Sequence, residues 1–156
     1  MRTDGTEEGT VVVIDINDEC QNNNAEDASP HLLAVVGDYL FFGANDGENG
    51  KELWKSDGTA EGTSMVKDIQ PGGNDGFIGT GINNRAVFKG EYYFTGLSSN
   101  SVGQELWKSD GTEEGTVMVK DIWPNYQKSS QPSNFVATTD YLYFVANDGV
   151  HGRELW

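Results

Sequence analysis

Two short loops carry the oxygen-rich side chains that could bind a metal ion. Their sequences are Asn45-Asp46-Gly47-Glu48-Asn49 and Asn147-Asp148-Gly149. Because Ca²⁺ prefers carboxylate and amide oxygens, the candidate ligands are Asn45, Asp46, Asn147 and Asp148. The same residues are typical of a hairpin turn, in which Asn and Asp accept bonds from nearby backbone and Gly adopts positive φ. Ser98-Ser99-Asn100, in the second repeat described below, lacks the carboxylate, which favours the turn without excluding the cation.

The ionisable residues show no catalytic pattern. The chain has 25 acidic residues but only two histidines, His31 and His151, which lie in unlike positions. Glycoside cleavage needs two carboxylates about 5–10 Å apart in different environments, and a high acid content alone does not indicate such a pair. The spacing supports neither a Ser-His-Asp triad nor a histidine-rich metal site. We therefore expect no enzymatic activity.

A repeated motif dominates the chain. Glu-Leu-Trp-Lys-Ser-Asp-Gly-Thr occupies residues 52–59 and 105–112, and a third copy is split between Glu154-Leu155-Trp156 and Arg2-Thr3-Asp4-Gly5-Thr6. Three whole repeats lie between Arg2 and Trp156. A period of about 50 residues indicates a propeller or a stacked array, in which one repeat cannot bury its apolar face alone.

The motif residues themselves have structural interpretations. The Asp of each Asp-Gly-Thr can accept backbone N–H bonds across a tight turn, and the Thr hydroxyl can cap it. Three identical sites are also unlike a catalytic centre. The Trp of each motif is expected to bury roughly 150–250 Å² between sheets rather than to bind a ligand. These residues are Asp4, Asp57, Asp110, Trp54, Trp107 and Trp156.

Each repeat is predicted to form four short strands. Runs rich in Val, Tyr, Phe and Trp alternate with Gly-rich turns, and four antiparallel strands make a propeller blade. The constant 16-residue distance from Asp38, Glu91 and Asp140 to the following Trp predicts hairpins without insertions. We therefore predict an all-β propeller module over residues 1–156, with blades at about 32–69, 85–122, and 134–156 plus 2–16. The predicted strands are 32–36, 39–45, 51–57, 64–69, 85–89, 92–97, 104–110, 117–122, 134–138, 141–147, 153–156 and 10–16.

Composition narrows the setting. A formal charge of −15 argues against a nucleic-acid partner, because phosphates need a Lys/Arg surface. No apolar run approaches the roughly 18 residues of a membrane span, and residues 1–10 lack the layout of a signal peptide. The lone Cys20 excludes an internal disulfide and is interpreted as an incidental surface thiol, with an intermolecular bridge as the alternative.

The repeated motif resembles that of a known family. Glu-Leu-Trp-x-x-Asp-Gly-Thr-x-x-Gly-Thr followed by Val-Lys-Asp-Ile is similar to the ELWxxDGT repeats of large bacterial proteins. The resemblance covers nearly the whole chain and implies a β-propeller in an extracellular or cell-surface setting, with no known reaction. The chain departs from the pattern at Thr3, which replaces the Ser of the other copies, and in the split third repeat.

The split repeat leads to a functional hypothesis, which is assembly and adhesion. The third blade needs an outer strand, and residues 10–16 can supply it to the edge strand 153–156 of a neighbouring copy. The residues involved are Thr10, Val11, Val12, Val13, Ile14, Glu154, Leu155 and Trp156. Two copies would then close a six-bladed ring, or the same contact would build an open filament. The chain could also be part of a longer array, and closure within one chain is disfavoured because three blades must splay too far.

The alternative function is Ca²⁺-dependent binding of surface polysaccharide. The acidic loops would hold the cation, and exposed aromatic side chains would contact sugar. Trp123 and Tyr126 are the candidates, because both lie outside the repeated motif. A chelator separates the two hypotheses: a structural assembly keeps its size in chelator, whereas a calcium lectin loses its ligand.

Overall fold

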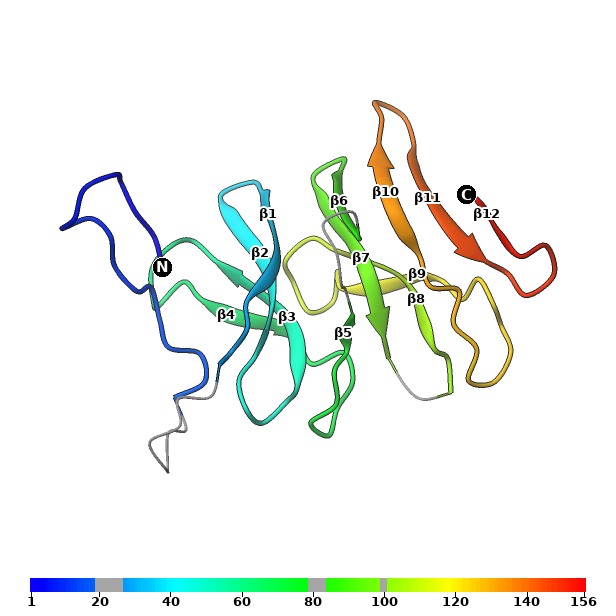
Figure 1. Cartoon of the computed structure of the whole chain (residues 1–156), viewed down its shortest axis with the longest axis horizontal. Coiled ribbons are helices and arrows are strands. Elements are labelled where there is room, and N and C mark those ends of the chain that lie inside the picture. Colours follow the sequence, from blue (N-terminus) through cyan, green and yellow to red (C-terminus); the bar gives the residue numbers. More distant parts are fainter. Residues whose placement is uncertain (19–26, 79–83, 99–100) are drawn as a thin grey trace.

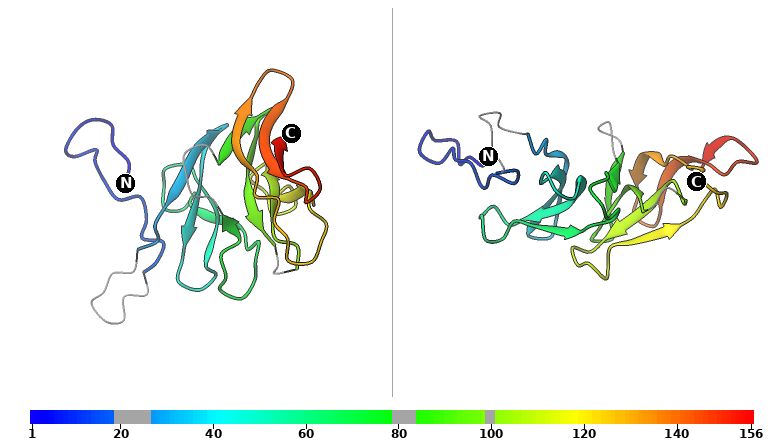
Figure 2. Two further views of the ribbon diagram at one scale, coloured as in Figure 1. Left: turned by 45° about the vertical axis from the view of Figure 1, so that its right-hand side comes forward. Right: turned by 90° about the horizontal axis from the view of Figure 1, so that it is seen from below.

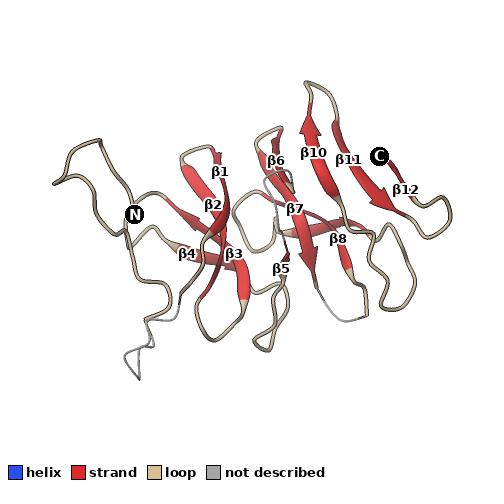
Figure 3. Cartoon of the chain, in the orientation of Figure 1, coloured by secondary structure: helices blue, strands red, loops and turns tan. Residues whose placement is uncertain are grey.

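The computed structural model describes residues 1–18, 27–78, 84–98 and 101–156. These residues form twelve strands and no helix, in three antiparallel sheets (Figures 1 and 3). No helix that could cross a membrane occurs within those ranges. The all-β prediction is therefore confirmed. The sheets are not closed into a ring: they stand in a row, with the N-terminal segment beyond the first and the C-terminus at the third (Figure 2).

Sheet 1 contains four strands in sequence order, as predicted for a repeat. These are β1 (His31–Val36), β2 (Tyr39–Asn45), β3 (Lys51–Ser56) and β4 (Ser64–Lys67). Sheet 3 has the first three of these positions filled, by β10 (Ser133–Ala137), β11 (Leu142–Asn147) and β12 (Arg153–Leu155).

Sheet 2 follows the same plan with its first strand in two pieces. Both β5 (Phe77–Ile78) and β6 (Arg85–Phe88) pair with β7 (Glu91–Leu97), which is followed by β8 (Gln104–Ser109) and β9 (Val117–Lys120). Because β5 meets Thr95 and Gly96 while β6 meets residues 91–94, the two occupy one strand position. Strand β5 was not predicted, since two residues are too short for an alternating pattern.

The predicted strand 10–16 has no sheet partner among the described residues. One isolated antiparallel bridge joins Arg2 to Val11. The predicted role of this segment in a neighbouring copy stays a prediction. Cys20, Ser99 and Asn100 lie outside the described residues, and so do the predictions made for them.

The expectation of hairpins without insertions is wrong. Phe42 pairs with Trp54 in sheet 1, and Phe94 pairs with Trp107 in sheet 2. The loop from Asn45 to Lys51 therefore has five intervening residues, whereas the loop from Leu97 to Gln104 has six. The constant 16-residue distance hides a one-residue shift, because the β6–β7 turn is Lys89-Gly90 where the β1–β2 turn is Gly37-Asp38. Both turns use positive φ, at Gly37 (58°) and Gly90 (80°).

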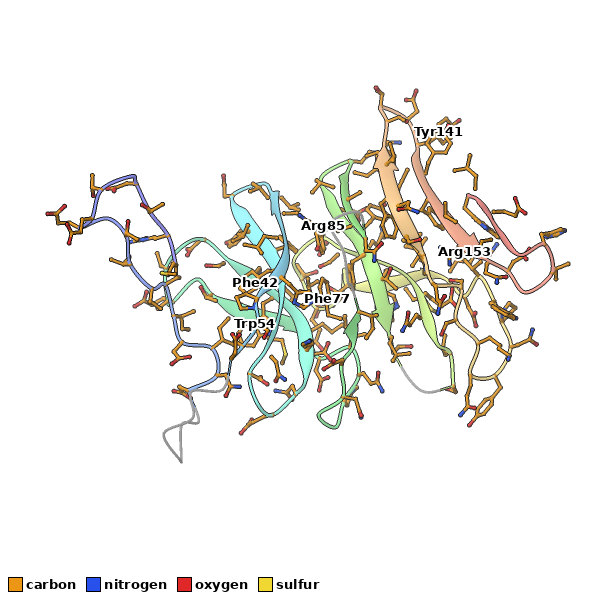
Figure 4. All side chains as sticks on the ribbon, in the orientation of Figure 1. Phe42, Trp54, Phe77, Arg85, Tyr141 and Arg153 are labelled. Carbon is orange, nitrogen blue, oxygen red and sulfur yellow. The ribbon has the colours of Figure 1, made fainter. Side chains whose placement is uncertain are left out.

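The core consists of two clusters, each between neighbouring sheets. The first cluster lies between the face of sheet 1 that carries Leu53 and the face of sheet 2 that carries Trp107. The second lies between the other face of sheet 2, which carries Leu106, and sheet 3. Figure 4 shows Phe77 between sheets 1 and 2. Buried members of the first cluster are Val36, Phe41, Leu53, Val66, Ile69, Phe77, Tyr92, Phe94 and Trp107. Those of the second are Leu106, Ile122, Phe135, Phe144 and Ala146.

We call the two faces of each sheet the forward face, which carries Leu53 or its counterpart, and the rear face, which carries Trp54 or its counterpart. Successive residues of a strand point to opposite faces, so adjacent motif residues serve different interfaces. The forward face of one sheet packs on the rear face of the next. Among the described residues, no neighbouring sheet packs on the rear face of sheet 1 or on the forward face of sheet 3.

Candidate assembly site

The three Asp-Gly-Thr turns have the same internal bonds. In the N-terminal turn, Asp4 Oδ1 accepts from Thr6 N (2.9 Å) and Thr6 Oγ1 (2.7 Å), and Thr6 Oγ1 accepts from Gly9 N (2.9 Å). The turns at Asp57 and Asp110 repeat these bonds with the same lengths. The structural interpretation of these aspartates is thus supported. The hydroxyl of Thr3 bonds to that of Thr10, as the hydroxyls of Ser56 and Ser109 bond to those of Thr63 and Thr116.

A cation links each turn to the next. Lys55 Nζ donates to Gly111 O (2.8 Å), and Arg2 Nη1 donates to Gly58 O (2.7 Å). Arg2 and Lys55 occupy the same motif position, two residues before the Asp. The N-terminal segment therefore meets sheet 1 as sheet 1 meets sheet 2. The third member, Lys108, forms an ion pair with Glu91 at 2.8 Å instead.

The motif glutamates tie each sheet to the segment that leaves it. Glu52 is fully buried and accepts from the N–H groups of Ile69 (2.9 Å) and Gly76 (2.9 Å). Glu105 is also fully buried and accepts from Ile122 N (3.0 Å) and Ser130 N (3.0 Å), with a further bond from Ser130 Oγ. Each carboxylate thus holds the start and the end of the connection to the next sheet.

Burial governs the pKa of these glutamates. Loss of hydration raises the pKa of Glu52 to about 7, although the N–H groups of Ile69, Gln70 and Gly76 act in the opposite direction. Burial also raises the pKa of Glu105. By contrast, hydrogen bonds from Thr6, Thr59 and Thr112 lower the pKa of Asp4, Asp57 and Asp110 respectively.

Stability should therefore peak in mildly acidic solution. A raised folded-state pKa means that the contribution of Glu52 is present below its ordinary 4.5 and is lost as pH rises through about 7. The turn aspartates act oppositely, because their lowered pKa values give stability that is lost on acidification below their ordinary 3.8. Urea unfolding from about pH 4 to about pH 9 measures the decline. A flat free energy of unfolding across neutral pH would contradict it, and Glu52→Gln should be less stable but lose most of the slope.

The corresponding residues of the third repeat are exposed to solvent. Glu154 lies on β12, where every residue is exposed, and its carboxylate accepts no hydrogen bond from another described residue. The glycine two residues before each glutamate shows the same difference. A Cβ at Gly50 or Gly103 would meet the carbonyl of Asn74 or Lys128 on the departing segment, whereas one at Gly152 would meet open space. Among the described residues, no segment therefore lies against Gly152 and Glu154 in the way that residues 69–76 and 122–130 lie against the corresponding positions of sheets 1 and 2.

The apolar forward face of sheet 3 is open as well. Leu155 is 72% exposed, whereas its counterparts Leu53 and Leu106 are 0% and 5% exposed. Beside it, Tyr143 is 39% exposed, and its counterpart Phe41 is 1% exposed. The same apolar positions are thus buried in the first two repeats and exposed in the third.

The rear face of sheet 1 is covered in part by the N-terminal segment. An apolar cavity of about 130 Å³ lies between them, lined among others by Val13, Ile16, Leu40 and Phe42. Figure 4 places Phe42 and Trp54 on this sheet. Val13 and Ile16 hold the positions of Val66 and Ile69, which belong to the first core cluster. Residues in the positions of Val66 and Ile69 therefore line a cavity against the rear face of sheet 1.

A comparison with family models, curated proteins and solved structures found no match to this chain. The role of each position is therefore inferred from its counterparts in the other repeats.

The candidate calcium loops use their oxygens within their own turns. Asp46 Oδ1 accepts from Glu48 N (3.0 Å) and Asn49 N (2.8 Å), and Asn45 Oδ1 accepts from Gly47 N (2.8 Å). Burial alone would raise the pKa of Asp46, but the bonds from Asn49 and Glu48 lower it. This geometry is that of the hairpin turn.

The loop of the third repeat is built in the same way. Asp148 Oδ1 accepts from Val150 N and His151 N, and Asn147 Oδ1 accepts from Gly149 N. His151 Nδ1 lies 2.7 Å from Asp148 Oδ2, a contact that raises the pKa of His151, and these bonds lower that of Asp148. The described ranges contain no group of three or more His, Cys, Asp or Glu placed to hold a metal.

Calcium binding at these loops remains testable as predicted. If it occurs, calorimetric titration should show two ions per chain, one lost in Asp46→Asn and one in Asp148→Asn. Binding to the folded state alone would stabilise by about 2.7 kcal/mol at a hundredfold excess over Kd. A melting temperature that does not respond to calcium would leave the loops as turns.

The two candidate ligand aromatics differ in exposure. Trp123 is half-buried, and a Cβ at Gly149 would overlap its ring. Lys128 Nζ lies 5.7 Å from the ring centroid. Trp123 therefore packs the segment after β9 against the β11–β12 turn. Asn17, at the same distance from its turn aspartate, lies against Gly47 in the β2–β3 turn. Tyr126 is 73% exposed and is the accessible member of the pair.

Proposed function

We propose that this protein is a structural module that assembles head to tail, through its third sheet and the N-terminal segment of a second copy. The observation that carries the proposal is the contrast between buried Leu53 and Leu106 and exposed Leu155. Residues 2–16 of a second copy complete sheet 3. The rear face of that copy's sheet 1 then covers the forward face of sheet 3.

The register of the added strand follows from pairs already present in the chain. The bridge between Arg2 and Val11 corresponds to the pair Lys55–Ser64 of sheet 1. The next pairs of that ladder are Trp54–Met65 and Leu53–Lys67. Their counterparts between copies are Trp156 with Val12 and Leu155 with Ile14. The isolated bridge is thus the first rung of a ladder whose other rungs need a second chain.

The apolar surfaces match in the same arrangement. The first core cluster combines Phe41 and Leu53 of one sheet with Phe94 and Trp107 of the next. Between copies, Tyr143 and Leu155 would face Phe42 and Trp54. The cavity lined by Val13, Ile16 and Phe42 lies where Tyr143 and Leu155 of the other copy would enter. Burying a leucine side chain contributes roughly 1.5–3 kcal/mol, so the contact has an apolar driving force.

The contact is heterologous, since a different surface is used on each copy. Such contacts give rings when the rotation closes and filaments when it does not. Two copies would supply six blades, within the usual range of about 4–8 for a propeller. We propose an extracellular, adhesive and non-enzymatic role, which the resemblance of the sequence to surface-protein repeats supports.

Sedimentation velocity of the intact chain tests the proposal. We expect particles larger than the 17.0 kDa protomer, with a discrete dimer for a ring and a broad, concentration-dependent series for a filament. Size should be unchanged in chelator. A protomer-sized particle from low micromolar to high micromolar concentration would contradict head-to-tail assembly.

A further inference from the structure

The carboxylate of Glu154 is exposed and accepts no hydrogen bond from another described residue of its own chain, whereas its counterparts Glu52 and Glu105 are fully buried. Resting on the proposed assembly, we propose that Glu154 sets the register between copies: its carboxylate binds the backbone N–H groups of Ile16 and Ala28 of a second copy. Glu154 then acts as a specificity-determining residue.

Ile16 is identified by its place after the turn. Glu52 binds the N–H of Ile69, which follows the turn aspartate Asp57, and Glu105 binds that of Ile122, which follows Asp110 at the same spacing. Ile16 follows Asp4 at this spacing too. Its N–H donates to no other described residue in the single chain.

Ala28 is identified by a backbone bond at the entrance to sheet 1. Ala28 O accepts from Asn45 N (2.9 Å), as Gly76 O accepts from Leu97 N (2.8 Å) and Ser130 O from Asn147 N (2.9 Å). Gly76 and Ser130 are the residues whose N–H groups bind Glu52 and Glu105. Ala28 has their place at the start of a sheet, and its N–H also donates to no other described residue.

The chemistry explains why a carboxylate is needed and why it selects one register. A carboxylate only accepts, so it satisfies N–H donors on both oxygens, whereas an amide side chain offers one acceptor oxygen. A slip of one residue would turn every side chain of the added strand to the other face. It would also move the N–H of Ile16 away from Glu154, so polar and apolar contacts would fail together.

The experiment compares the dissociation constant between copies for wild type, Glu154→Gln and Glu154→Asp, with Glu114→Gln as a control of equal charge change. Glu114 is exposed on the turn after β8. We expect at least a tenfold rise in Kd for both Glu154 variants, because Gln loses an acceptor oxygen and Asp falls one methylene short. The dissociation constant of the Glu114→Gln control should equal that of wild type, and none of the variants should change the melting temperature of the protomer.

Amide hydrogen exchange gives a second readout. In the wild-type assembly, the amides of Ile16 and Ala28 should be protected, and Glu154→Gln should release both while leaving Gly9, which is bonded within its own turn, unaffected. Wild-type assembly with unchanged Kd and unchanged protection in Glu154→Gln would overturn the role of Glu154 and leave assembly standing. A wild-type chain that stays a protomer would overturn both.

Discussion

Replacing Leu155 with aspartate is expected to abolish assembly without lowering the melting temperature of the protomer. The side chain is 72% exposed in the single chain, so the new charge is solvated there and would be buried only between copies, where an unpaired charge is costly. The same change at Leu106, which is 5% exposed, should prevent folding. Light scattering and thermal unfolding measure the two effects.

A mixing experiment tests whether sheet 3 of one copy binds the N-terminal segment of another. Leu155→Asp spoils the forward face of sheet 3 but keeps the N-terminal segment, and deletion of residues 1–16 does the reverse. Each variant alone should stay a protomer, whereas an equimolar mixture should form a one-to-one complex through the remaining pair of surfaces. Assembly of Leu155→Asp by itself, or failure of the mixture to associate while wild type does, would contradict the head-to-tail contact.

Trp107→Ala is expected to destabilise the chain by roughly 3–5 kcal/mol, the cost of deleting a buried aromatic side chain. Trp107 is 6% exposed in the core between sheets 1 and 2, where its ring lies 6.5 Å from that of Phe94. A Cβ at Gly96 would overlap the ring, which shows how closely β7 approaches it. Urea unfolding measures the change.

Trp54→Ala is the matched control, because Trp54 has the same motif position on the rear face of sheet 1, which no other sheet covers, and is half-buried. It should cost less than Trp107→Ala in the protomer. Equal and small effects would place both rings outside the cores and favour a ligand-binding role for the motif tryptophans. In the assembled protein, the two variants should lose more similar amounts of unfolding free energy, because a second copy would then cover Trp54.

Much of the fold could be predicted from the sequence because the repeats supply three views of one unit. Every end of the four strands of sheet 1 and the three strands of sheet 3 lies within two residues of the predicted bound. Burial of Trp107 and the turn role of Asp57 and Asp110 also follow from their types. These features are local, set by alternation and turn chemistry.

The rest depends on contacts that spacing does not report. A one-residue shift between hairpins was compensated in the next loop, so the distance from Glu91 to Trp107 looked regular. The burial of Glu52 and Glu105 was missed because a charged residue beside a turn is usually exposed. A signal existed, since the same glutamate precedes Leu-Trp in all three repeats. Its partners, however, are backbone groups 17 to 25 residues away.

The N-terminal turn has a kinetic consequence. Its bonds join the same atoms, at nearly the same lengths, as those of the embedded turns at Asp57 and Asp110, before any partner is present. The conformational entropy of this hairpin is therefore lost during folding and not during encounter. Docking then resembles the meeting of two preorganised surfaces, with typical association rates of about 10⁵–10⁷ M⁻¹s⁻¹. Changes in affinity among variants should appear mainly as changes in the lifetime of the contact.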